Sequence, residues 1–256
     1  MLLNYHEFGQ GRPIIILHGL FGSARNWQGV ARALAENHRV ITPDLRNHGQ
    51  SFHEDSMSYI DMADDIITLC DHLNLTDVIL MGHSLGGKVA MTVALTHPEQ
   101  LSALIIVDIA PFDYEHSFHD LVAAMLDMNL NNIKSRTDAE ASLKMITDDL
   151  NVVQFILQNL IRVDGKFCWR INLETISASL TSLSQFPENL KNKSCHMPSL
   201  FLGGSESNYI QSIHNAAIYQ HFPAAEITMI EGSGHWLHVE KPKEFLHEVQ
   251  NFINFV

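Results

Sequence analysis

The sequence predicts an α/β protein with a mainly parallel sheet that carries helices on both faces. Short apolar runs of strand length alternate with amphipathic stretches of helical spacing through most of the 256 residues. Alternation of this kind favours parallel strands joined by right-handed helical crossovers. Between residues 112 and 192 the alternation lapses and helical patterns follow one another, so we expect a helical lobe to be inserted there.

Three apolar runs in the N-terminal part indicate strands. Residues 2–8 alternate loosely and suit a sheet edge, residues 13–17 are typical of a fully buried strand, and residues 39–42 form the third run. Apolar residues at helical spacing predict helices over 26–36 and 58–73.

The charged residues of this part are interpreted as structural. Asp44 and Arg46 lie in the polar loop after residue 42, where hydrogen bonds and a salt bridge would orient the backbone. On the helix over 58–73, the acidic residues fall outside the apolar face and predict a solvated surface: Asp61, Asp64, Asp65 and Asp71.

The stretch around Ser84 combines a buried strand, a sharp turn and a helix. Four apolar residues, 78–81, run into a Gly-x-Ser-x-Gly pentapeptide, and a helical pattern follows as far as His97. A Cβ on Gly82 or Gly86 would collide with the neighbouring strand or helix. The free N–H groups of the helix favour negative charge near the serine. This pattern indicates a nucleophile elbow.

The second half of the chain resumes the strand and helix alternation after the inserted lobe. Strands are expected at 101–107, 198–202 and 225–230, with helices over 210–221 and 243–255. Within the lobe, the patterns predict a turn around Asp164-Gly165 and four helices, over 118–130, 139–150, 152–161 and 173–186.

Composition argues against nucleic acid, membranes and metal ions as partners. Acidic residues outnumber basic ones by 29 to 16, and the formal net charge of −13 disfavours nucleic acid or an anionic membrane surface as a partner. Neither a membrane span nor a signal peptide is indicated, which predicts a cytoplasmic protein. The three cysteines form no Cys-x-x-Cys pair, and His116 with His119 lacks further ligands at a metal-site spacing, so no metal is expected.

Several motifs together resemble those of a known family. The elbow at 82–87, the His-Gly-Leu-Phe-Gly loop at 18–22 and the Gly234-His235 pair look like the α/β-hydrolase superfamily, and the match covers essentially the whole chain. More closely, four segments are similar to the small bacterial esterases of the YbfF type: residues 17–23, 44–49, 107–111 and 232–236.

The resemblance implies an α/β-hydrolase fold with a mainly parallel eight-stranded sheet. A helical cap would be inserted after the sixth strand, so that the core comprises residues 1–111 and 193–256 and the cap residues 112–192. We expect this cap to be mobile and to cover an apolar pocket for an acyl chain.

The resemblance also implies a serine esterase or thioesterase that hydrolyses small acyl esters, including acyl-CoA thioesters, without a cofactor. Ser84 would attack the acyl carbonyl after His235 takes its proton, and an acyl-enzyme would form. The backbone amides of Leu20 and Leu85 match the oxyanion donors of the family.

Two carboxylates are candidates for the acid that supports His235. Most of the superfamily places this acid after the seventh strand, where Glu206 stands, whereas the YbfF-type esterases place it after the sixth, where Asp108 stands. We expect Asp108, because it follows its strand directly, with Glu206 as the alternative. Ser207 matches a serine that assists the histidine in this subfamily, which predicts a tetrad.

Two other classes of function stay open on the sequence. A carbon–carbon bond hydrolase or lyase, similar to the menaquinone-pathway synthase, would share the elbow and the cap, and a ligand receptor of the same fold would turn over little. The acyl chain length, the leaving group and the oligomeric state are not written in the sequence. A coenzyme A leaving group would need local cations, for which the candidates are Arg25, Lys88, Lys134 and Arg136.

Overall fold

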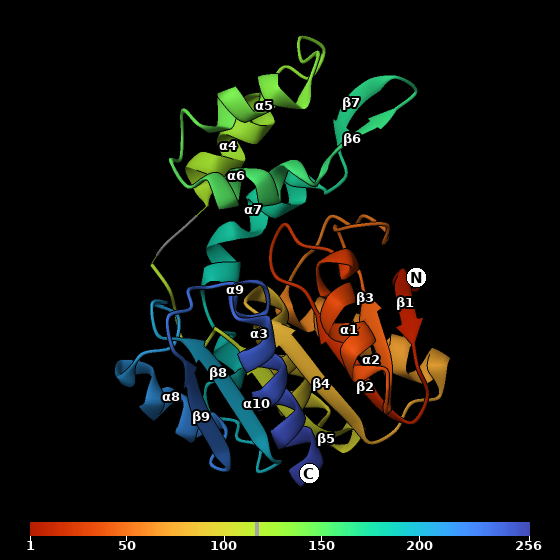
Figure 1. Cartoon of the computed structure of the whole chain (residues 1–256), viewed down its shortest axis with the longest axis vertical. Helices are drawn as coiled ribbons and strands as arrows, with labels where there is room; N and C mark the ends of the chain where they lie inside the picture. Colours follow the sequence, from red (N-terminus) through yellow and green to blue (C-terminus); the bar gives the residue numbers. More distant parts are fainter. Residues whose placement is uncertain (116–117) are drawn as a thin grey trace.

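A twisted sheet of seven strands forms the centre of the protein. The computed structural model describes residues 1–115 and 118–256, and its strand order is β1-β3-β2-β4-β5-β8-β9 (Figure 1). Every neighbouring pair is parallel except β1 and β3, which are antiparallel. The strands are β1 (Tyr5–Phe8), β2 (Arg12–Leu17), β3 (His38–Pro43), β4 (Val78–His83), β5 (Leu101–Val107), β8 (Ser199–Gly204) and β9 (Ala225–Ile230).

The mainly parallel α/β fold is therefore confirmed, but the expected eight strands are wrong. Within the described residues the main sheet has seven strands. The strand expected over residues 2–8 is observed as β1 and begins at Tyr5, whereas Asn4 binds the loop after β3, accepting from the amide of Asp44 at 2.8 Å and donating to Ser51 at 2.9 Å. In the observed order, the helical lobe follows the fifth strand, β5, and not a sixth.

Helices cover both faces of the sheet, as the alternation predicts. One face packs against α1 and α10 through a cluster that includes Trp27 and Phe245, and the other against α2, α3 and α8. Successive residues of β2 point to opposite clusters, since Ile14 belongs to the first and Ile15 to the second. The helices and 3₁₀ turns of this part are η1 (Ala24–Trp27), α1 (Gln28–Leu34), α2 (Tyr59–Leu73), α3 (Leu85–Thr96), η2 (Pro98–Gln100), η4 (Ser212–His214), α8 (Asn215–His221), α9 (Leu237–Glu240) and α10 (Pro242–Phe255).

The inserted lobe lies over one end of the sheet, and α7 runs from it toward the sheet (Figure 1). Its buried apolar residues, such as Val122 and Ile156, belong to the same cluster as the α2 and α3 face. The division of the chain into a core and a cap of residues 112–192 stays a prediction. The elements of the lobe are α4 (His119–Asp127), α5 (Arg136–Leu143), α6 (Leu150–Leu157), β6 (Leu160–Val163), β7 (Lys166–Trp169), α7 (Leu173–Ser184) and η3 (Glu188–Leu190).

Two helix predictions in the lobe are wrong at their ends. The helix expected over 139–150 lies at 136–143, because Ser135 caps it by accepting a hydrogen bond from the amide of Asp138. The helix expected over 152–161 stops at Leu157, and Leu160 already begins the β6–β7 hairpin around the predicted Asp164-Gly165 turn. None of the helices within residues 1–115 and 118–256 combines the length and the apolarity that crossing a bilayer requires.

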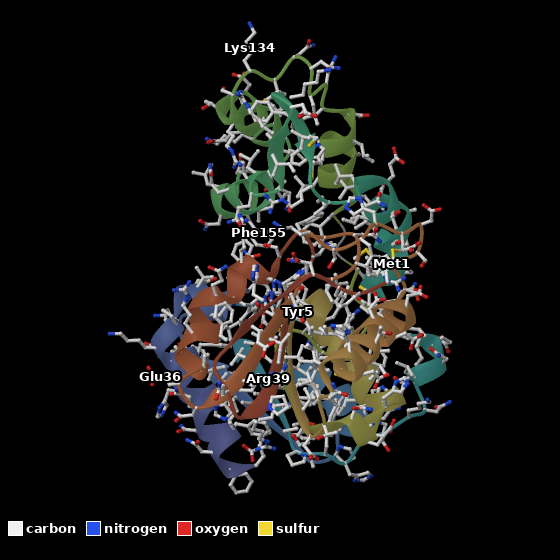
Figure 2. All side chains as sticks on the ribbon, turned by 90° about the vertical axis from the view of Figure 1, so that its right-hand side faces the viewer. Met1, Tyr5, Glu36, Arg39, Lys134 and Phe155 are labelled. Atoms are coloured by element: carbon white, nitrogen blue, oxygen red, sulfur yellow. The ribbon has the colours of Figure 1, made fainter. Side chains whose placement is uncertain are left out.

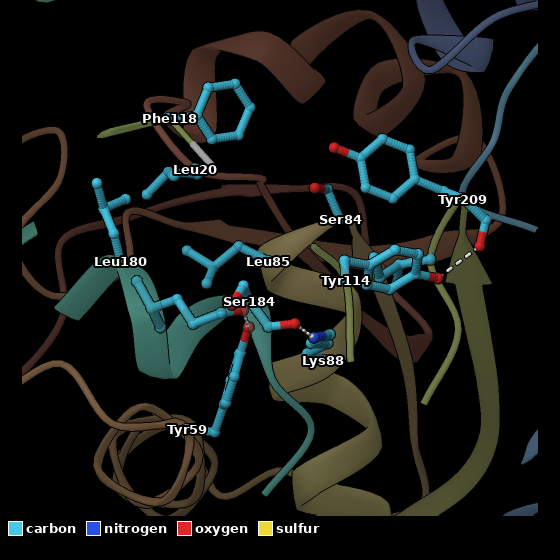
Figure 3. A pocket seen from close by; sticks show the side chains of 12 residues that line it. Leu20, Tyr59, Ser84, Leu85, Lys88, Tyr114, Phe118, Leu180, Ser184 and Tyr209 are labelled. Atoms are coloured by element: carbon cyan, nitrogen blue, oxygen red, sulfur yellow. Dashed lines mark hydrogen bonds between the residues drawn. The ribbon is translucent and has the colours of Figure 1, made fainter. Parts of the chain in front are cut away.

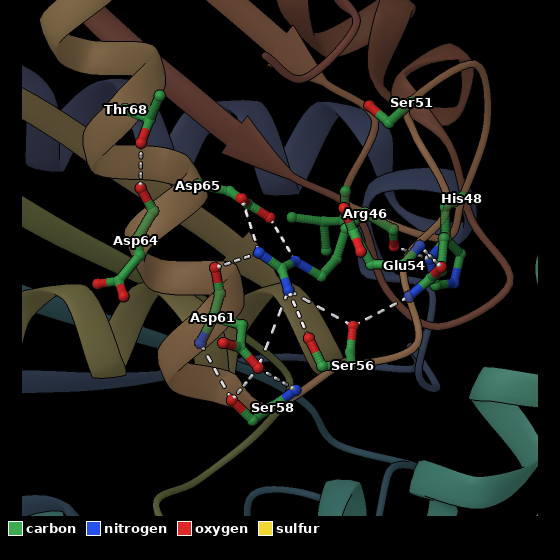
Figure 4. Close-up of polar contacts among 12 residues, drawn as sticks. Arg46, His48, Ser51, Glu54, Ser56, Ser58, Asp61, Asp64, Asp65 and Thr68 are labelled. Atoms are coloured by element: carbon green, nitrogen blue, oxygen red, sulfur yellow. Dashed lines mark hydrogen bonds and ion pairs between the residues drawn. The ribbon is translucent and has the colours of Figure 1, made fainter. Parts of the chain in front are cut away.

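One carboxylate of α2 is not part of a solvated face. Asp65 is buried and receives two hydrogen bonds from the guanidinium of Arg46, at 2.6 and 2.8 Å (Figure 4). Its prediction as a solvent-facing residue is wrong because the loop after β3 folds over this turn of α2. Asp61 lies beside the same guanidinium at 3.8 Å and also forms the capping box of α2 with Ser58. Arg46 therefore ties the loop to the helix, as its expected structural role requires.

Asp44 has a similar structural role. Its carboxylate accepts hydrogen bonds from the backbone amides of Ala24, at 2.7 Å, and Gln50, at 2.8 Å, and from the side chain of Asn4. Three segments that are distant in the sequence thus meet on one side chain, which fixes the loops beside the end of β2.

Replacing Asp65 with asparagine is expected to lower the free energy of unfolding by about 3 kcal/mol, because the buried guanidinium loses its bidentate partner. Urea unfolding would measure this change. Arg39→Gln is the matched control, since the Arg39–Glu7 pair has side chains that are 28% and 38% exposed, and its loss should cost less than about 1 kcal/mol. Equal effects of the two substitutions would contradict the structural role of Asp65.

Candidate active site

Ser84 occupies a strained turn between β4 and α3. Its φ of 52° and ψ of −118° place a non-glycine residue in a region that L-amino acids rarely adopt. The turn is held because the Ser84 amide donates to Val107 of β5 at 3.0 Å. A Cβ on Gly82 would lie 2.1 Å from the carbonyl oxygen of Gly86, and one on Gly86 2.6 Å from that of His18. The glycines of the motif are thus required by space, as the sequence predicts.

Asp108 lies at the end of β5 and is fully buried. Its Oδ2 is 2.7 Å from Nδ1 of His235 and also accepts a hydrogen bond of 2.5 Å from the hydroxyl of Ser207. Its Oδ1 accepts a hydrogen bond from the amide of Gly204 at 3.1 Å. The alternative acid, Glu206, is exposed, and among the described residues Asp108 is the carboxylate that contacts His235.

The ring of His235 is positioned by two residues that the sequence analysis did not single out. Tyr209 stacks on it with ring centroids 4.2 Å apart, and His83 lies on another side at 4.6 Å. Nε2 of His83 is 2.8 Å from the carbonyl oxygen of His235, and burial lowers the pKa of His83, so that this ring stays neutral. With Nδ1 directed at Asp108, Nε2 of His235 is the nitrogen left for proton transfer.

The loop after β2, which contains Leu20, is held by two neutral histidines. The amide of Gly22 donates to Gly19 at 3.0 Å and closes a turn in which Phe21 has a φ of 61°. Nε2 of His48 accepts the hydrogen bond of the Phe21 amide at 3.2 Å. Burial lowers the pKa of His48 to about 3, which keeps this acceptor unprotonated at neutral pH.

His18 links the start of this loop to the loop after β3. Its Nε2 accepts from the amide of Leu45 at 3.0 Å, and burial lowers its pKa as well. From the lobe, the side chain of Asn159 donates to the carbonyl of Phe21 at 2.7 Å, and Asn26 donates to Gln158 at 3.0 Å. The loop that carries Leu20 is therefore fixed by both the sheet side and the lobe side of the protein.

Leu85, the other predicted oxyanion residue, is the first residue of α3. Amides in the first turn of a helix have no intrahelical partner, so its N–H is available to a ligand beside Ser84. Leu20 and Leu85 both line the same cavity as Ser84, which places the two predicted donors around one space.

The cavity at Ser84 has a volume of about 70 Å³ and is mainly apolar (Figure 3). Leucines from the lobe helix α7 face leucines from the core across it, and the hydroxyl of Ser84 lies near the ring of Tyr209. Such a lining suits an acyl chain better than a charged group. The lining residues are Leu20, Tyr59, Ser84, Leu85, Lys88, Ile109, Tyr114, Phe118, Leu180, Leu183, Ser184 and Tyr209.

Among the described residues of this lining, Lys88 is the only lysine or arginine, and its ammonium group is buried. Nζ donates to the carbonyl oxygens of Ser184 at 2.8 Å and Gln185 at 2.9 Å, where α7 ends (Figure 3). The rings of Tyr59 and Tyr114 lie 5.8 and 5.2 Å from it. Lys88 thus binds the lobe to α3, and with its side chain committed in this way it does not form an open site for coenzyme phosphates.

Burial lowers the pKa of Lys88 to about 7, against an ordinary value near 10.5. Between these pH values the folded protein binds fewer protons than the unfolded chain. The Lys88 contribution to the free energy of unfolding therefore rises with pH, by up to about 1.4 kcal/mol per pH unit.

In the Lys88→Met variant, this rise in the free energy of unfolding between pH 7 and pH 9 is expected to disappear. Urea unfolding at several pH values measures it, with exposed Lys144→Met as the control. Parallel curves for wild type and Lys88→Met would contradict the assignment.

The remaining sequence candidates lie apart from Ser84. Lys134 is exposed at the outer end of the lobe, as Figure 2 shows, whereas Arg25 and Arg136 line a different cavity. His116 lies outside the described residues. Within the part of the chain that the structure describes, no three His, Cys, Asp or Glu residues are grouped as a metal site would need.

The chain is similar to several known proteins in sequence and in fold. Residues 12–242 match the family model of the alpha/beta hydrolase fold. The sn-1-specific diacylglycerol lipase ABHD11 of Xenopus tropicalis is 40% identical over 257 residues, which cover 97% of this chain and 80% of that protein. Esterase YbfF of Escherichia coli is 32% identical over 246 residues, covering 94% and 93%. A solved marine microorganism esterase superposes with a TM-score of 0.94 at 36% identity, covering 98% and 99%.

Proposed function

Because the chain belongs to the alpha/beta hydrolase fold family, we propose that it is a serine hydrolase that cleaves carboxylic acyl esters through an acyl-enzyme. The observation that carries the proposal is the placement of Ser84 on its strained turn at the wall of an apolar cavity, with the ring of His235 held against Asp108. The printed names of the relatives, two esterases and a diacylglycerol lipase, support the same class.

In the proposed mechanism, Nε2 of His235 takes the proton of Ser84 as its oxygen attacks the acyl carbonyl. Asp108 stabilises the imidazolium that forms and keeps the ring oriented. The amides of Leu20 and Leu85 bind the oxyanion, and losing one such donor typically costs about 3 kcal/mol. The protonated His235 then gives its proton to the leaving group. In the second half of the reaction, neutral His235 activates a water molecule, which hydrolyses the acyl-enzyme.

Ser207 would act on Asp108 rather than on the substrate. Its hydroxyl donates to the oxygen of Asp108 that also faces His235, so it stabilises the charged carboxylate. Thioesters are included in the proposal because the same attack on the carbonyl expels a thiolate as readily as an alkoxide.

Hydrolysis of p-nitrophenyl esters from acetate to dodecanoate tests the proposal. We expect kcat/KM to pass through a maximum and then to fall, because α7 and Lys88 close the cavity around the acyl chain. A folded protein that hydrolyses none of these esters would contradict the proposal and would favour a carbon–carbon bond hydrolase or a ligand receptor. A burst of p-nitrophenol, equal to one per protein molecule, would identify the acyl-enzyme.

A further inference from the structure

A second cavity, of about 330 Å³, lies between the lobe and the loop after β2. Three arginines from separate elements line it: Arg25 of η1, Arg136 at the start of α5 and Arg170 directly after β7. Gln158 and Asn159, which link the lobe to the loop after β2, form another wall. As far as residues 1–115 and 118–256 are concerned, the lining contains no aspartate or glutamate, although acidic residues outnumber basic ones in the chain by 29 to 16.

The three positive charges are close enough to act on one another. Burial, and then the charge of Arg25, lower the pKa of Arg170, and Arg136 acts in the same direction. Asp44 is the acid that opposes this effect, but its oxygens already accept hydrogen bonds from two backbone amides and from Asn4. The cavity therefore holds positive charge that no carboxylate in its own lining neutralises.

These arginines differ from those with structural partners elsewhere in the protein. Arg46 and Arg39 each bind a carboxylate, at 2.6 and 2.8 Å. Among the described residues, the guanidinium groups of Arg25 and Arg170 have no hydrogen-bonded partner. Arg136 is held by the carbonyl oxygens of Leu157 and Leu160, at 2.9 and 2.8 Å, which fixes its guanidinium at the cavity wall.

Residues that line this cavity are in contact with residues that line the Ser84 cavity. Leu20 lines the Ser84 cavity, and the next residue, Phe21, lines the arginine cavity. The ring of Phe21 packs edge-on against Phe118, another residue of the Ser84 cavity, with centroids 5.5 Å apart. In the proposed function the apolar cavity binds the acyl chain. The arginine cavity is then available to the leaving group of the ester.

We propose that Arg25, Arg136 and Arg170 bind a phosphate group carried by the leaving group of the substrate. This inference rests on the proposed ester hydrolysis at Ser84. Guanidinium groups pair with phosphate oxygens through two parallel hydrogen bonds, and converging arginines are typical of such sites. A phosphorylated leaving group has two chemical sources, a coenzyme A thioester and an acylated glycerol phosphate, and both offer the same phosphate oxygens.

The test compares three butyryl substrates in wild type, Arg25→Gln, Arg170→Gln and the double variant. Butyryl-CoA and 1-butyryl-glycerol 3-phosphate carry phosphate, whereas p-nitrophenyl butyrate does not. For the preferred phosphate-bearing substrate, we compare its kcat/KM with that of p-nitrophenyl butyrate. We expect this ratio to fall at least about tenfold for each arginine replaced. The fall should come from a higher KM, because a charge-assisted hydrogen bond to the phosphate is lost. The substrate that shows the fall identifies the source of the phosphate.

Arg162→Gln is the matched control, because Arg162 lies on β6 in the lobe and its guanidinium packs over Phe167 at 4.4 Å, outside the cavity. An unchanged ratio in the double variant, or an equal fall in Arg162→Gln, would overturn the proposal. The proposal would also be overturned if the wild type cleaved p-nitrophenyl butyrate but neither butyryl-CoA nor 1-butyryl-glycerol 3-phosphate. That result would leave the proposed ester hydrolysis intact.

If no ester is hydrolysed, the proposed function fails. Binding of phosphate compounds then tests whether the arginines form a phosphate site. Calorimetry would then titrate coenzyme A and glycerol 3-phosphate into the wild type and into the Arg25→Gln, Arg170→Gln double variant. Binding to the wild type that weakens at least about tenfold in the double variant supports the phosphate site. Absence of binding of either compound to the wild type overturns it.

Discussion

Replacing Ser84 with alanine is expected to reduce kcat for p-nitrophenyl butyrate by on the order of a millionfold, to the level left by the remaining groups of the site. The substitution removes the proposed nucleophilic oxygen, which the strained turn at residue 84 presents to the cavity. Burst and steady-state assays with p-nitrophenyl butyrate measure the loss.

The fold of this variant is checked independently, because alanine must adopt the same positive φ as Ser84. Ser102→Ala is the matched control, since Ser102 is a half-buried serine of β5 whose hydroxyl binds Asp77 far from the cavity. Ser84→Ala protein that keeps its native circular dichroism spectrum and more than about a hundredth of wild-type kcat would rule out Ser84 as the nucleophile.

Replacing Asp108 with asparagine is expected to reduce kcat by about ten thousandfold while leaving KM almost unchanged. In the wild type, Nδ1–H of His235 donates to Asp108 at 2.7 Å. An amide of the same size can present its NH₂ group to His235, which favours the tautomer with the proton on Nε2 and blocks that nitrogen as a base. The assay is kcat as a function of acyl chain length and pH.

Two neighbouring variants separate this role from general disturbance of the loop. Glu206→Gln changes an exposed carboxyl and is expected to alter kcat by less than about twofold. Ser207→Ala keeps the contact between Asp108 and His235 but removes one hydrogen bond to the carboxylate, and is expected to cost about tenfold. A larger loss in Glu206→Gln than in Asp108→Asn would reverse the assignment of the acid.

The parts of the fold that were predictable from sequence depend on local patterns. The turn at Ser84 needs only a buried strand, small residues at positions 82 and 86 and a helix, and all of these are contiguous in the chain. The strands of the parallel sheet are continuous apolar runs, which makes them visible without knowledge of their partners. The β6–β7 hairpin has four-residue strands with few buried side chains, so no clear periodicity marks it.

The features that were missed depend on contacts between distant segments. Asp65 falls among the acidic residues of α2, and only the folding of Arg46 over that turn, 19 residues away, makes it a buried partner. Lys88 resembles any lysine on a helix until the end of α7, 96 residues later, covers it. The acid was not missed, since Asp108 was expected with Glu206 as the alternative, but both residues follow strands and only the contact with His235 distinguishes them. In the structure the amide of Asp108 binds β8, and its carboxylate turns inward.

The inserted helical lobe is not an interchangeable module for protein engineering. Directly after α6, Asn159 donates a hydrogen bond to the carbonyl oxygen of Phe21, and Gln158 accepts one from Asn26 of η1. A lobe transplanted from a relative would change the shape of the Ser84 cavity and, unless it brought equivalent amides, would also release one of the predicted oxyanion donors. If the cavity binds the acyl chain as proposed, redesign of acyl selectivity is better confined to Leu180 and Leu183 on α7, which line the cavity without taking part in those bonds.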